Sequence, residues 1–277
     1  YPNSFCSNKS TEGLTMYILE GIKRTNDGYS FDFSRDEFND IINTVGLKIN
    51  ISSFSDNVYY FGYEFTKNTN STERANFIKW LKKLKVSDVN NDVASFIDRP
   101  LIQLNKEINL NNINAFIYPM SSQNDLLKII KREAGRCLPH SVNKYSINLM
   151  KNLPREIQFD WDLFEQEHGD SEISTYRNMK KYIQNELLPS IQKSEYFSIG
   201  RDVKPKYRQF FMNYLRFEDK KQEELLKQIQ KGTILVIDDI NTSGSTLNEI
   251  LRIVRSINPD CTIYIFTLIG KSSMDFS

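Results

Sequence analysis

One segment, residues 234–247 with the sequence ILVIDDINTSGSTL, constrains the fold of this chain more than any other. It begins with four branched apolar residues, and such a run is typical of a strand that is buried on both faces. Asp238 and Asp239 follow where this strand would end. A turn of small and hydroxylic residues, 242–246, leads into a helical pattern with apolar residues at 247, 250, 251 and 254. The segment predicts a strand, an acidic pair, a turn and a helix in immediate succession.

The turn has the chemistry of a phosphate site. The free N–H groups at a helix N-terminus bind a phosphate dianion, and Gly244 lets the backbone approach a ligand closely. Further donors are the hydroxyl groups of Thr242, Ser243, Ser245 and Thr246. The two carboxylates lie one step away, where they can accept hydrogen bonds from vicinal hydroxyls. These residues therefore predict a site for a sugar phosphate.

Three other interpretations of the segment are weaker. Response-regulator receivers also carry paired acids at a strand end, but there the pair follows the first strand, whereas here only about 30 residues remain. A Walker phosphate loop needs a Gly-x-x-x-x-Gly-Lys-Ser/Thr string, which the sequence lacks. A purely structural strand-to-helix turn leaves the two adjacent acids unexplained.

The same segment resembles the PRPP-binding signature of type I phosphoribosyltransferases over about 13 residues. In that family the acids hold the ribose 2- and 3-hydroxyls and the turn holds the 5-phosphate. The resemblance implies that Asp238 and Asp239 are the catalytic residues, holding the ribose and, indirectly through water or the ribose, Mg²⁺. It assigns the phosphate-binding role to Asn241, Thr242, Ser243, Gly244, Ser245 and Thr246.

The remaining composition narrows the choice of function. Cys6, Cys137 and Cys261 are scattered, so they form neither a disulfide framework nor a metal cluster, and a reducing, cytoplasmic setting is expected. Only two histidines are present, with no pattern that ties them to a nucleophile. A net charge of +1 gives no global field for nucleic acid or membranes, and the longest apolar stretch, 263–269, is too short to span a bilayer.

A second strand and helix are predicted upstream, at 114–118 and 124–134. Together with the strand, helix and strand predicted over 234–269, they indicate a parallel sheet flanked by helices. In type I phosphoribosyltransferases the corresponding first strand ends in a pyrophosphate-binding loop. The resemblance assigns that loop to Met120, Ser121, Ser122 and Gln123, although the basic residue or glycine that the family prefers is missing here.

About 98 residues separate these two units, an unusually long insertion for such a fold, and amphipathic helices are expected at 171–193 and 218–230. Between them, 201–216 holds five cationic side chains and one acid. We expect this loop to close over a pyrophosphate, with Lys204, Lys206 and Arg208 countering its charge. A solvated basic surface and a nucleic-acid contact are the alternatives, since Tyr and Phe are interleaved with the cations.

The expected organisation is an α/β fold of the type I phosphoribosyltransferase kind, with an α+β N-terminal region at 1–110 that acts as a hood or partner surface. The core then covers 111–277, with a helical insertion at about 140–230. Strands are expected at 16–22, 29–33, 47–51 and 57–65, and helices at 36–45 and 72–84, where the lysines are interpreted as a solvated face. The tyrosine-rich segment, the helix ending in Leu-Lys and the basic loop are similar to the ComF-like branch of the family. The four-cysteine zinc module of that branch is missing, so its role in DNA uptake is not transferred.

The resemblance implies transfer of phosphoribose from PRPP to a nitrogenous acceptor, with Mg²⁺ as cofactor and release of pyrophosphate. The acceptor carries no recognisable signature in this sequence. The alternative is a regulatory or effector protein that senses PRPP or a nucleoside monophosphate without transfer, because a fold does not determine an activity. A homodimer or a protein partner is compatible with the N-terminal region, and no membrane partner is expected.

Overall fold

A seven-stranded, mostly parallel sheet forms the centre of the molecule. The structure, a computed structural model, describes residues 22–25, 28–31, 50–65, 69–120, 125–137 and 145–271. The strand order is β3-β4-β11-β10-β5-β6-β9. The bounds are β3 Asn50–Phe54, β4 Asn57–Glu64, β5 Ile113–Met120, β6 Tyr145–Lys151, β9 Leu215–Phe217, β10 Thr233–Ile240 and β11 Thr262–Gly270. The strands from β4 to β6 in this order are parallel, and β3 and β9 are antiparallel at the two edges. The expected α/β class is confirmed at this level.

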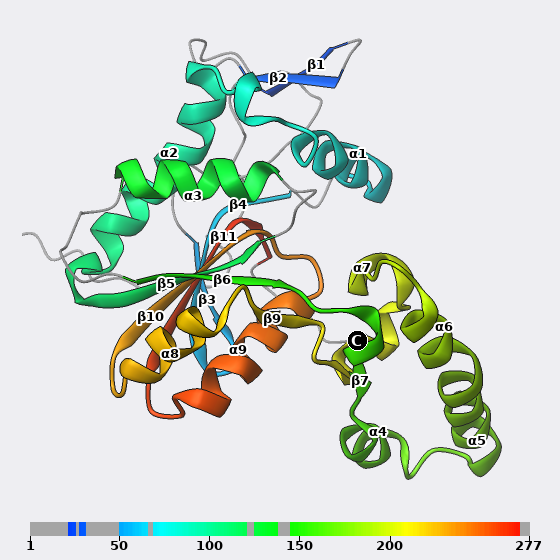
Figure 1. The fold of residues 1–277 in the computed structure, drawn as a ribbon. Coiled ribbons are helices and arrows are strands. Elements are labelled where there is room, and N and C mark those ends of the chain that lie inside the picture. The colour runs from blue at the N-terminus through cyan, green and yellow to red at the C-terminus, as the bar shows by residue number, and fades with distance from the viewer. Residues whose placement is uncertain are drawn as a thin grey trace, which may run out of the picture.

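Helices cover both faces of the sheet, and a group of shorter helices projects from one side as an arm (Figure 1). On one face lie α1 Ser71–Leu81, α2 Asn91–Glu107 and α3 Asp125–Cys137, and on the other α8 Lys220–Gln228 and α9 Ser245–Ile257. The arm contains α4 Trp161–His168, α5 Ile173–Tyr182, α6 Leu188–Lys193 and α7 Ile199–Asp202. Two small sheets pair β1 Ile22–Thr25 with β2 Gly28–Phe31, and β7 Gln158–Phe159 with β8 Phe211–Met212.

The apolar run of β10 is explained by its central place in the sheet. Leu235 and Ile237 are buried with side chains of α1, α2 and α3, whereas Ile234 and Val236 are buried with those of α9. Since successive side chains of a strand point to opposite faces, a strand covered on both sides needs apolar residues at every position. The prediction of a strand buried on both faces is confirmed.

The strand, helix and strand predicted around the acidic pair are present as β10, α9 and β11. The two strands run parallel, with Thr233 opposite Thr262 and Asp238 opposite Thr267. The backbone N–H of Asn241 extends this pairing by donating to the carbonyl of Ile269 at 2.9 Å. The upstream unit is also present, because β5 lies beside β10 in parallel and α3 follows it.

The N-terminal region is part of the main sheet. β4 pairs in parallel with β11, and β3 pairs with β4 at the sheet edge. Backbone hydrogen bonds therefore join residues on the two sides of position 110 in one sheet. The predicted strands at 29–33, 47–51 and 57–65 correspond in part to β2, β3 and β4, and the helix at 72–84 to α1. The expected helix at 36–45 lies outside the described residues, as does all but Ile22 of the strand at 16–22.

The insertion contains the two helical segments that were expected, with one difference. Residues 173–193 are helical throughout, with a π-helical turn over Ile183–Leu187 between α5 and α6. The π-helical turn ends two residues before Pro189, and the chain stays helical there although proline cannot donate a backbone hydrogen bond. No helix within the described ranges is long and apolar enough to cross a membrane.

Candidate functional site

The acidic pair lies at the carboxyl edge of the parallel strands, the edge at which open α/β sheets bind their ligands. Asp238 and Asp239 are buried, with exposed fractions of 6% and 3%. The N–H of Asp239 donates to Oδ1 of Asp238 at 2.8 Å, and the N–H of Ile240 donates to Oδ1 of Asp239 at 2.6 Å. Both carboxylates are thus held within the end of β10 rather than directed into solvent.

Burial changes the protonation of this pair. The pKa of the Asp238 carboxyl is raised well above its usual range, first because burial removes water from the charged form and second because the Asp239 carboxylate lies beside it. Lys82 partly offsets this effect. Hydroxyl donors or a cation arriving at the pair would favour the fully ionised form, so ligand binding here is expected to be linked to proton release.

The turn after β10 leaves the N-terminus of α9 open. Gly244 precedes the helix with φ 72°, a left-handed conformation that glycine adopts without strain, and no side chain caps the helix. The amide oxygen of Asn241 accepts the N–H of Gly244 at 2.9 Å, and the Ser243 and Ser245 hydroxyls lie 3.0 Å apart. Because the first N–H groups of a helix have no intrahelical acceptor, this turn presents donors to an anion.

Two buried tyrosines form hydrogen bonds with residues at the carboxyl edge of the sheet. The hydroxyl of Tyr214 donates to the carbonyl of Ser245, at the start of α9. The hydroxyl of Tyr59 lies 2.7 Å from Oγ1 of Thr267 and also hydrogen-bonds Asn241. A Cβ atom on Gly270 would lie 1.9 Å from that hydroxyl, so glycine is required for this approach. These contacts were not predicted from the sequence.

Lys82, at the end of α1, brings a positive charge to the acids. It is the C-cap residue of α1, and its Nζ lies 3.4 Å from Oδ2 of Asp239. The Lys82 side chain is 43% exposed and the Asp239 side chain 4%. The interpretation of the α1 lysines as a solvated face is therefore wrong for Lys82, because the fold places the end of α1 over the carboxyl edge of β10.

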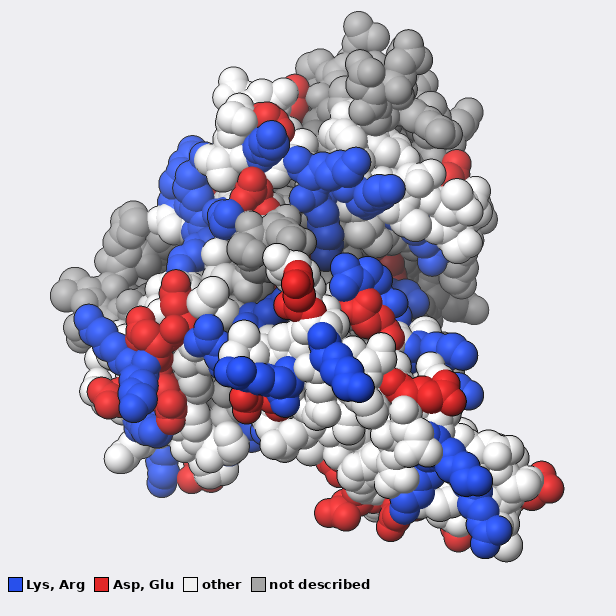
Figure 2. Space-filling model, turned by 45° about the vertical axis from the view of Figure 1, so that its right-hand side comes forward, with Lys and Arg blue, Asp and Glu red and all other residues white. Residues whose placement is uncertain are grey.

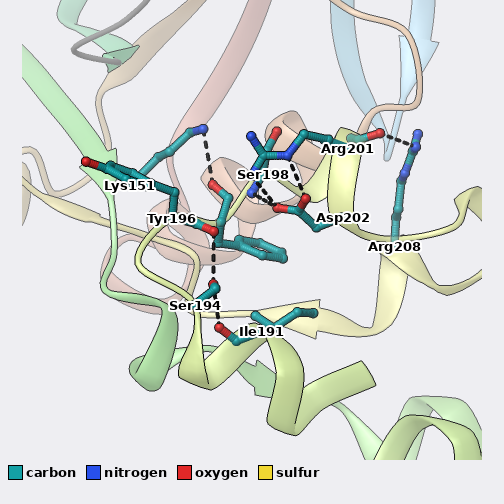
Figure 3. Close-up of polar contacts among 10 residues, drawn as sticks. Lys151, Ile191, Ser194, Tyr196, Ser198, Arg201, Asp202 and Arg208 are labelled. Atoms are coloured by element: carbon teal, nitrogen blue, oxygen red, sulfur yellow. Dashed lines mark hydrogen bonds and ion pairs between the residues drawn. The ribbon is translucent and has the colours of Figure 1, made fainter. Parts of the chain in front are cut away.

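Lys151 interacts electrostatically with Lys82 and with a third cation, Arg201. Lys151 ends β6, and its Nζ donates to the carbonyl of Phe197 at 3.2 Å (Figure 3). Arg201 of α7 is paired with Asp202 at 2.6 Å. The pKa of Lys151 is lowered, first by burial and then by repulsion from Arg201 and Lys82, and Asp202 partly offsets the repulsion. Lys82, Lys151 and Arg201 are hereafter the edge cations. Figure 2 shows Lys and Arg side chains across the middle of the face between the α1 side of the molecule and the arm, with acids among them.

The segment 201–216 is not the loop that was expected. It contains the end of α7, a 3-10 helix at Pro205–Phe210, β8 and β9. Its buried side chains are Val203, Tyr207, Phe210, Phe211, Tyr214 and Leu215. The expectation of a loop was wrong because the apolar residues interleaved with the cations pack into the core below the sheet.

The three cations predicted for this segment make contacts within the insertion. Nζ of Lys204 lies 5.6 Å from the ring centre of Tyr182, and Nζ of Lys206 lies 4.8 Å from that of Tyr207. Arg208 donates to the carbonyl of Gly200 at 2.6 Å (Figure 3) and to the carbonyl of Val203 at 2.8 Å. These contacts connect the three side chains to the insertion, whereas Lys82 pairs with Asp239, and Lys151, which also contacts the insertion through Phe197, is close enough to Lys82 to be repelled by it.

The pyrophosphate loop assigned by resemblance follows β5. Met120 is the last residue of that strand and is partly buried. Ser121, Ser122 and Gln123 lie outside the described residues. Because β5 is parallel to β10 and beside it, β5 ends at the same edge of the sheet as the acidic pair.

The expected Mg²⁺ requires ligands beyond the protein. Among the described residues, no group of three or more His, Cys, Asp and Glu side chains could hold a metal ion. Asp238 and Asp239 supply two carboxylates, and Mg²⁺ commonly completes such a site with water and the phosphate oxygens of a substrate. The donor set therefore fits a metal that arrives with its ligand.

Lys82 and Lys151 were missed because each lies far from the motif in the sequence. Lys151 had a usable signal, since 145–151 alternates with Ile147 and Leu149 inward and ends in a lysine, as a strand of the parallel sheet would. Lys82 had none, because several lysines follow one another there and only the packing of α1 selects one of them.

No known family model matches this chain, and a search of curated proteins finds no significant match. The relationship to type I phosphoribosyltransferases therefore stays a prediction from the motif.

Proposed function

We propose that this protein binds PRPP or a nucleoside monophosphate at the β10–α9 turn and transfers phosphoribose to a nitrogenous acceptor, releasing pyrophosphate. One observation carries the proposal: a buried pair of carboxylates adjoins an uncapped helix N-terminus. The first suits a vicinal diol and the second a phosphate, and the two are joined by a turn of few residues.

The acids and the turn hold the two ends of the pentose. Asp238 and Asp239 accept hydrogen bonds from the ribose 2- and 3-hydroxyls, and the N–H groups and hydroxyls of 242–246 hold the 5-phosphate. With both ends fixed, C1 of the ribose is held in one position and the reaction becomes effectively unimolecular. Asp238 and Asp239 would hold Mg²⁺ through water or the ribose, and the ion would supply positive charge against the pyrophosphate.

The edge cations are the groups that counter the leaving pyrophosphate. Breaking the bond from C1 to oxygen leaves positive charge on the sugar and negative charge on the pyrophosphate, so fixed cations stabilise the transition state most where that charge develops. Lys151 and Arg201 come from β6 and α7, on the arm side of the acids. They replace Lys204, Lys206 and Arg208 in this role.

The ion pair between Lys82 and Asp239 also affects how the ligand binds. In the empty site it neutralises Asp239 from 3.4 Å. When ribose hydroxyls donate hydrogen bonds to Asp239, Lys82 is free to turn from that carboxylate to the pyrophosphate. Its partly exposed side chain allows this exchange without movement of α1.

The proposal is tested by calorimetry with PRPP, with and without Mg²⁺, together with an assay for pyrophosphate release over a panel of nitrogenous acceptors. Replacing both acids, Asp238→Asn with Asp239→Asn, should weaken PRPP binding by at least ~100-fold, since each charged hydrogen bond contributes about 1.5–3 kcal/mol. Asp162→Asn, at an exposed acid of α4, is the matched control and should change nothing.

The outcomes separate the two candidate functions. Binding with release of pyrophosphate supports transfer. Binding that depends on Asp238 and Asp239 but never releases pyrophosphate assigns the protein to sensing. If wild-type protein does not bind PRPP, ribose 5-phosphate or a nucleoside monophosphate, the proposed site is wrong.

A further inference from the structure

Two residues of the insertion, Asn213 and Tyr214, join the two halves of the proposed site. They lie between β8 and β9 and connect the end of β6, which carries Lys151, to α9, which follows the phosphate turn. Asn213 and Tyr214 are hereafter the bridge. Strands β6 and β10 are not neighbours, because β5 lies between them, and two strand spacings amount to about 10 Å.

On the β6 side, the bonds of the bridge go to Asn152, the residue after Lys151. The backbone N–H of Asn152 donates to the carbonyl of Tyr214 at 2.9 Å, and its side-chain amide donates to the carbonyl of Asn213 at 2.9 Å. The end of β6 is therefore fixed to the bridge through both the backbone and the side chain of one residue.

On the α9 side, the bridge bonds the helix at two points. The hydroxyl of Tyr214 donates to the carbonyl of Ser245, the first residue of α9, and Oδ1 of Asn213 accepts from Arg252 at 2.9 Å. Arg252 is itself held by the buried carboxylate of Glu249 through bonds of 2.8 and 2.9 Å. Because partly buried polar networks hold their members in one geometry, these bonds fix the first half of α9 against the bridge.

Asn213 adopts an uncommon backbone conformation while it makes these bonds. Its φ is 61°, in the left-handed region, which asparagine tolerates better than most residues. Among the described residues, the other non-glycine residues with positive φ are Ser55 and Asp56, in the two-residue turn of the β3–β4 hairpin, where such values are usual. Asn213 instead connects strands of two different sheets, so its conformation serves the bonds to both sides rather than a hairpin turn.

Close packing is incomplete at this junction. A cavity of about 270 Å³ lies between α9 and the insertion, and Tyr214, Ser245, Glu249 and Arg252 are among the residues that line it. Side chains that face each other across a cavity lose most of their contact energy. The hydrogen bonds of the bridge therefore carry much of the constraint on the start of α9.

We propose that the bridge sets the distance between the phosphate turn and Lys151, with Asn213 as its positioning residue. The inference rests on the proposed function and narrows its ligand class to pentoses that carry phosphate groups on both C5 and C1. Such a ligand gains affinity over its separate parts only while the two halves of the site keep a fixed spacing.

Calorimetry on the full chain in the presence of Mg²⁺ tests this with ribose 5-phosphate, pyrophosphate and PRPP. Asn213→Gly keeps the left-handed backbone and removes the bond to Arg252. Affinity for PRPP should fall ~10-fold, because the spacing between its two binding points is relaxed, whereas affinity for each of the other probes should change less than about twofold. Asn152→Ala removes the side-chain bond on the β6 side and should do the same, so a folding failure of one variant does not decide the result.

Two control variants separate the bonds of the bridge from its backbone. Asn213→Asp keeps an acceptor for Arg252 and should retain the affinity for PRPP. Asp56→Gly relaxes an exposed residue with φ 62° in the β3–β4 turn and should change none of the three affinities.

The outcomes distinguish the bridge from the site that it serves. An equal loss for all three probes, no loss for PRPP, or the same selective loss in Asp56→Gly or Asn213→Asp overturns the bridge while the proposed function stands. A wild-type protein that binds neither ribose 5-phosphate nor PRPP overturns the proposed function itself, and this inference with it.

Discussion

Two sets of cationic side chains in this protein resemble each other in composition and differ in position. Lys204, Lys206 and Arg208 are close together in the sequence, and the structure places them against aromatic rings and backbone carbonyls of the insertion. Lys82 and Lys151 are separated by 68 residues, yet Lys82 pairs with Asp239, and Lys151, at the end of β6, is close enough to Lys82 to be repelled by it. Proximity in the sequence was therefore a poor guide to proximity at the site.

The difference follows from what lies between the cations. In 201–216 the intervening residues are large and apolar, and their burial attaches the segment to the core. Lys82 and Lys151 instead end a helix and a strand, and the ends of elements at the carboxyl edge of a parallel sheet surround its ligand site. In this protein, cations at the ends of helices and strands are therefore better candidates for contacting the proposed pyrophosphate than cations in a basic run of the sequence.

The largest expected effect comes from removing two positive charges from one of these sets and comparing it with the same removal from the other. Lys82→Met with Lys151→Met keeps the apolar stems and removes two charges facing the proposed pyrophosphate. We expect affinity for Mg²⁺-pyrophosphate and PRPP to fall by at least ~100-fold, equivalent to about 2.7 kcal/mol. Calorimetry at constant ionic strength measures it.

Lys204→Met with Lys206→Met is the matched control, with two charges removed from the other set. It should change affinity by less than about twofold, because exposed cations that lack an anionic partner contribute little. A control pair that weakens binding as much as the test pair would restore the lid interpretation and remove the contrast between the two sets.

The next largest effect concerns side-chain packing, which we compare between the acidic edge of the sheet and α7 of the arm. Gly270→Ala places a Cβ atom 1.9 Å from the Tyr59 hydroxyl, and we expect it to lower the free energy of unfolding by about 1–3 kcal/mol. Gly200→Ala, in α7, meets nothing within 4 Å and should change stability little. Urea denaturation compares them.

Tyr59→Phe removes the hydroxyl that the new methyl group would meet, so it should recover part of the loss in Gly270→Ala. If Gly270→Ala proves as stable as the wild type, the acidic edge is not packed as closely as this contact requires.

The pH dependence of stability gives a third test. Because the pKa of Asp238 is raised in the folded state, folding retains a proton that the unfolded chain releases. Stability from this group is complete below the unfolded carboxyl pKa, about 3.9, and is lost as pH rises above it, by at most about 1.4 kcal/mol per pH unit. Urea denaturation of Asp238→Asn between about pH 5 and 8 should show a smaller decline than wild type; parallel curves would refute the raised pKa.

The smallest expected change is at the support of the phosphate turn. Tyr214→Phe removes the hydroxyl that donates to the Ser245 carbonyl, at a cost of about 1 kcal/mol in stability. Affinity for ribose 5-phosphate should fall by a few fold, since the start of α9 loses one restraint. Calorimetry and thermal melting measure the two effects, and an unchanged affinity would show that Tyr214 supports only the fold.

Much of the core could be predicted because its signals are local. The run 234–237 specified a buried strand, and the pattern after it specified α9. α2 and β6 were not predicted. α2 contains Pro100 in its interior, which usually indicates the end of a helix, and here its ring packs against Gly62 of β4. The alternating run of β6 was a signal, but it covers only seven residues, and its pairing with β5 is what establishes it as a strand.

The sequence by itself determined the acidic pair, the open helix N-terminus after it and the parallel unit around them, because strand burial, glycine conformation and helix periodicity act over a few residues. Tertiary structure alone decided that Lys82 and Lys151 are the cations at that edge, that the basic segment is packed into the insertion, and that a cavity opens beside Ser245. Those outcomes depend on contacts between residues distant in the chain, which form only when helices pack on the sheet and bury their apolar faces.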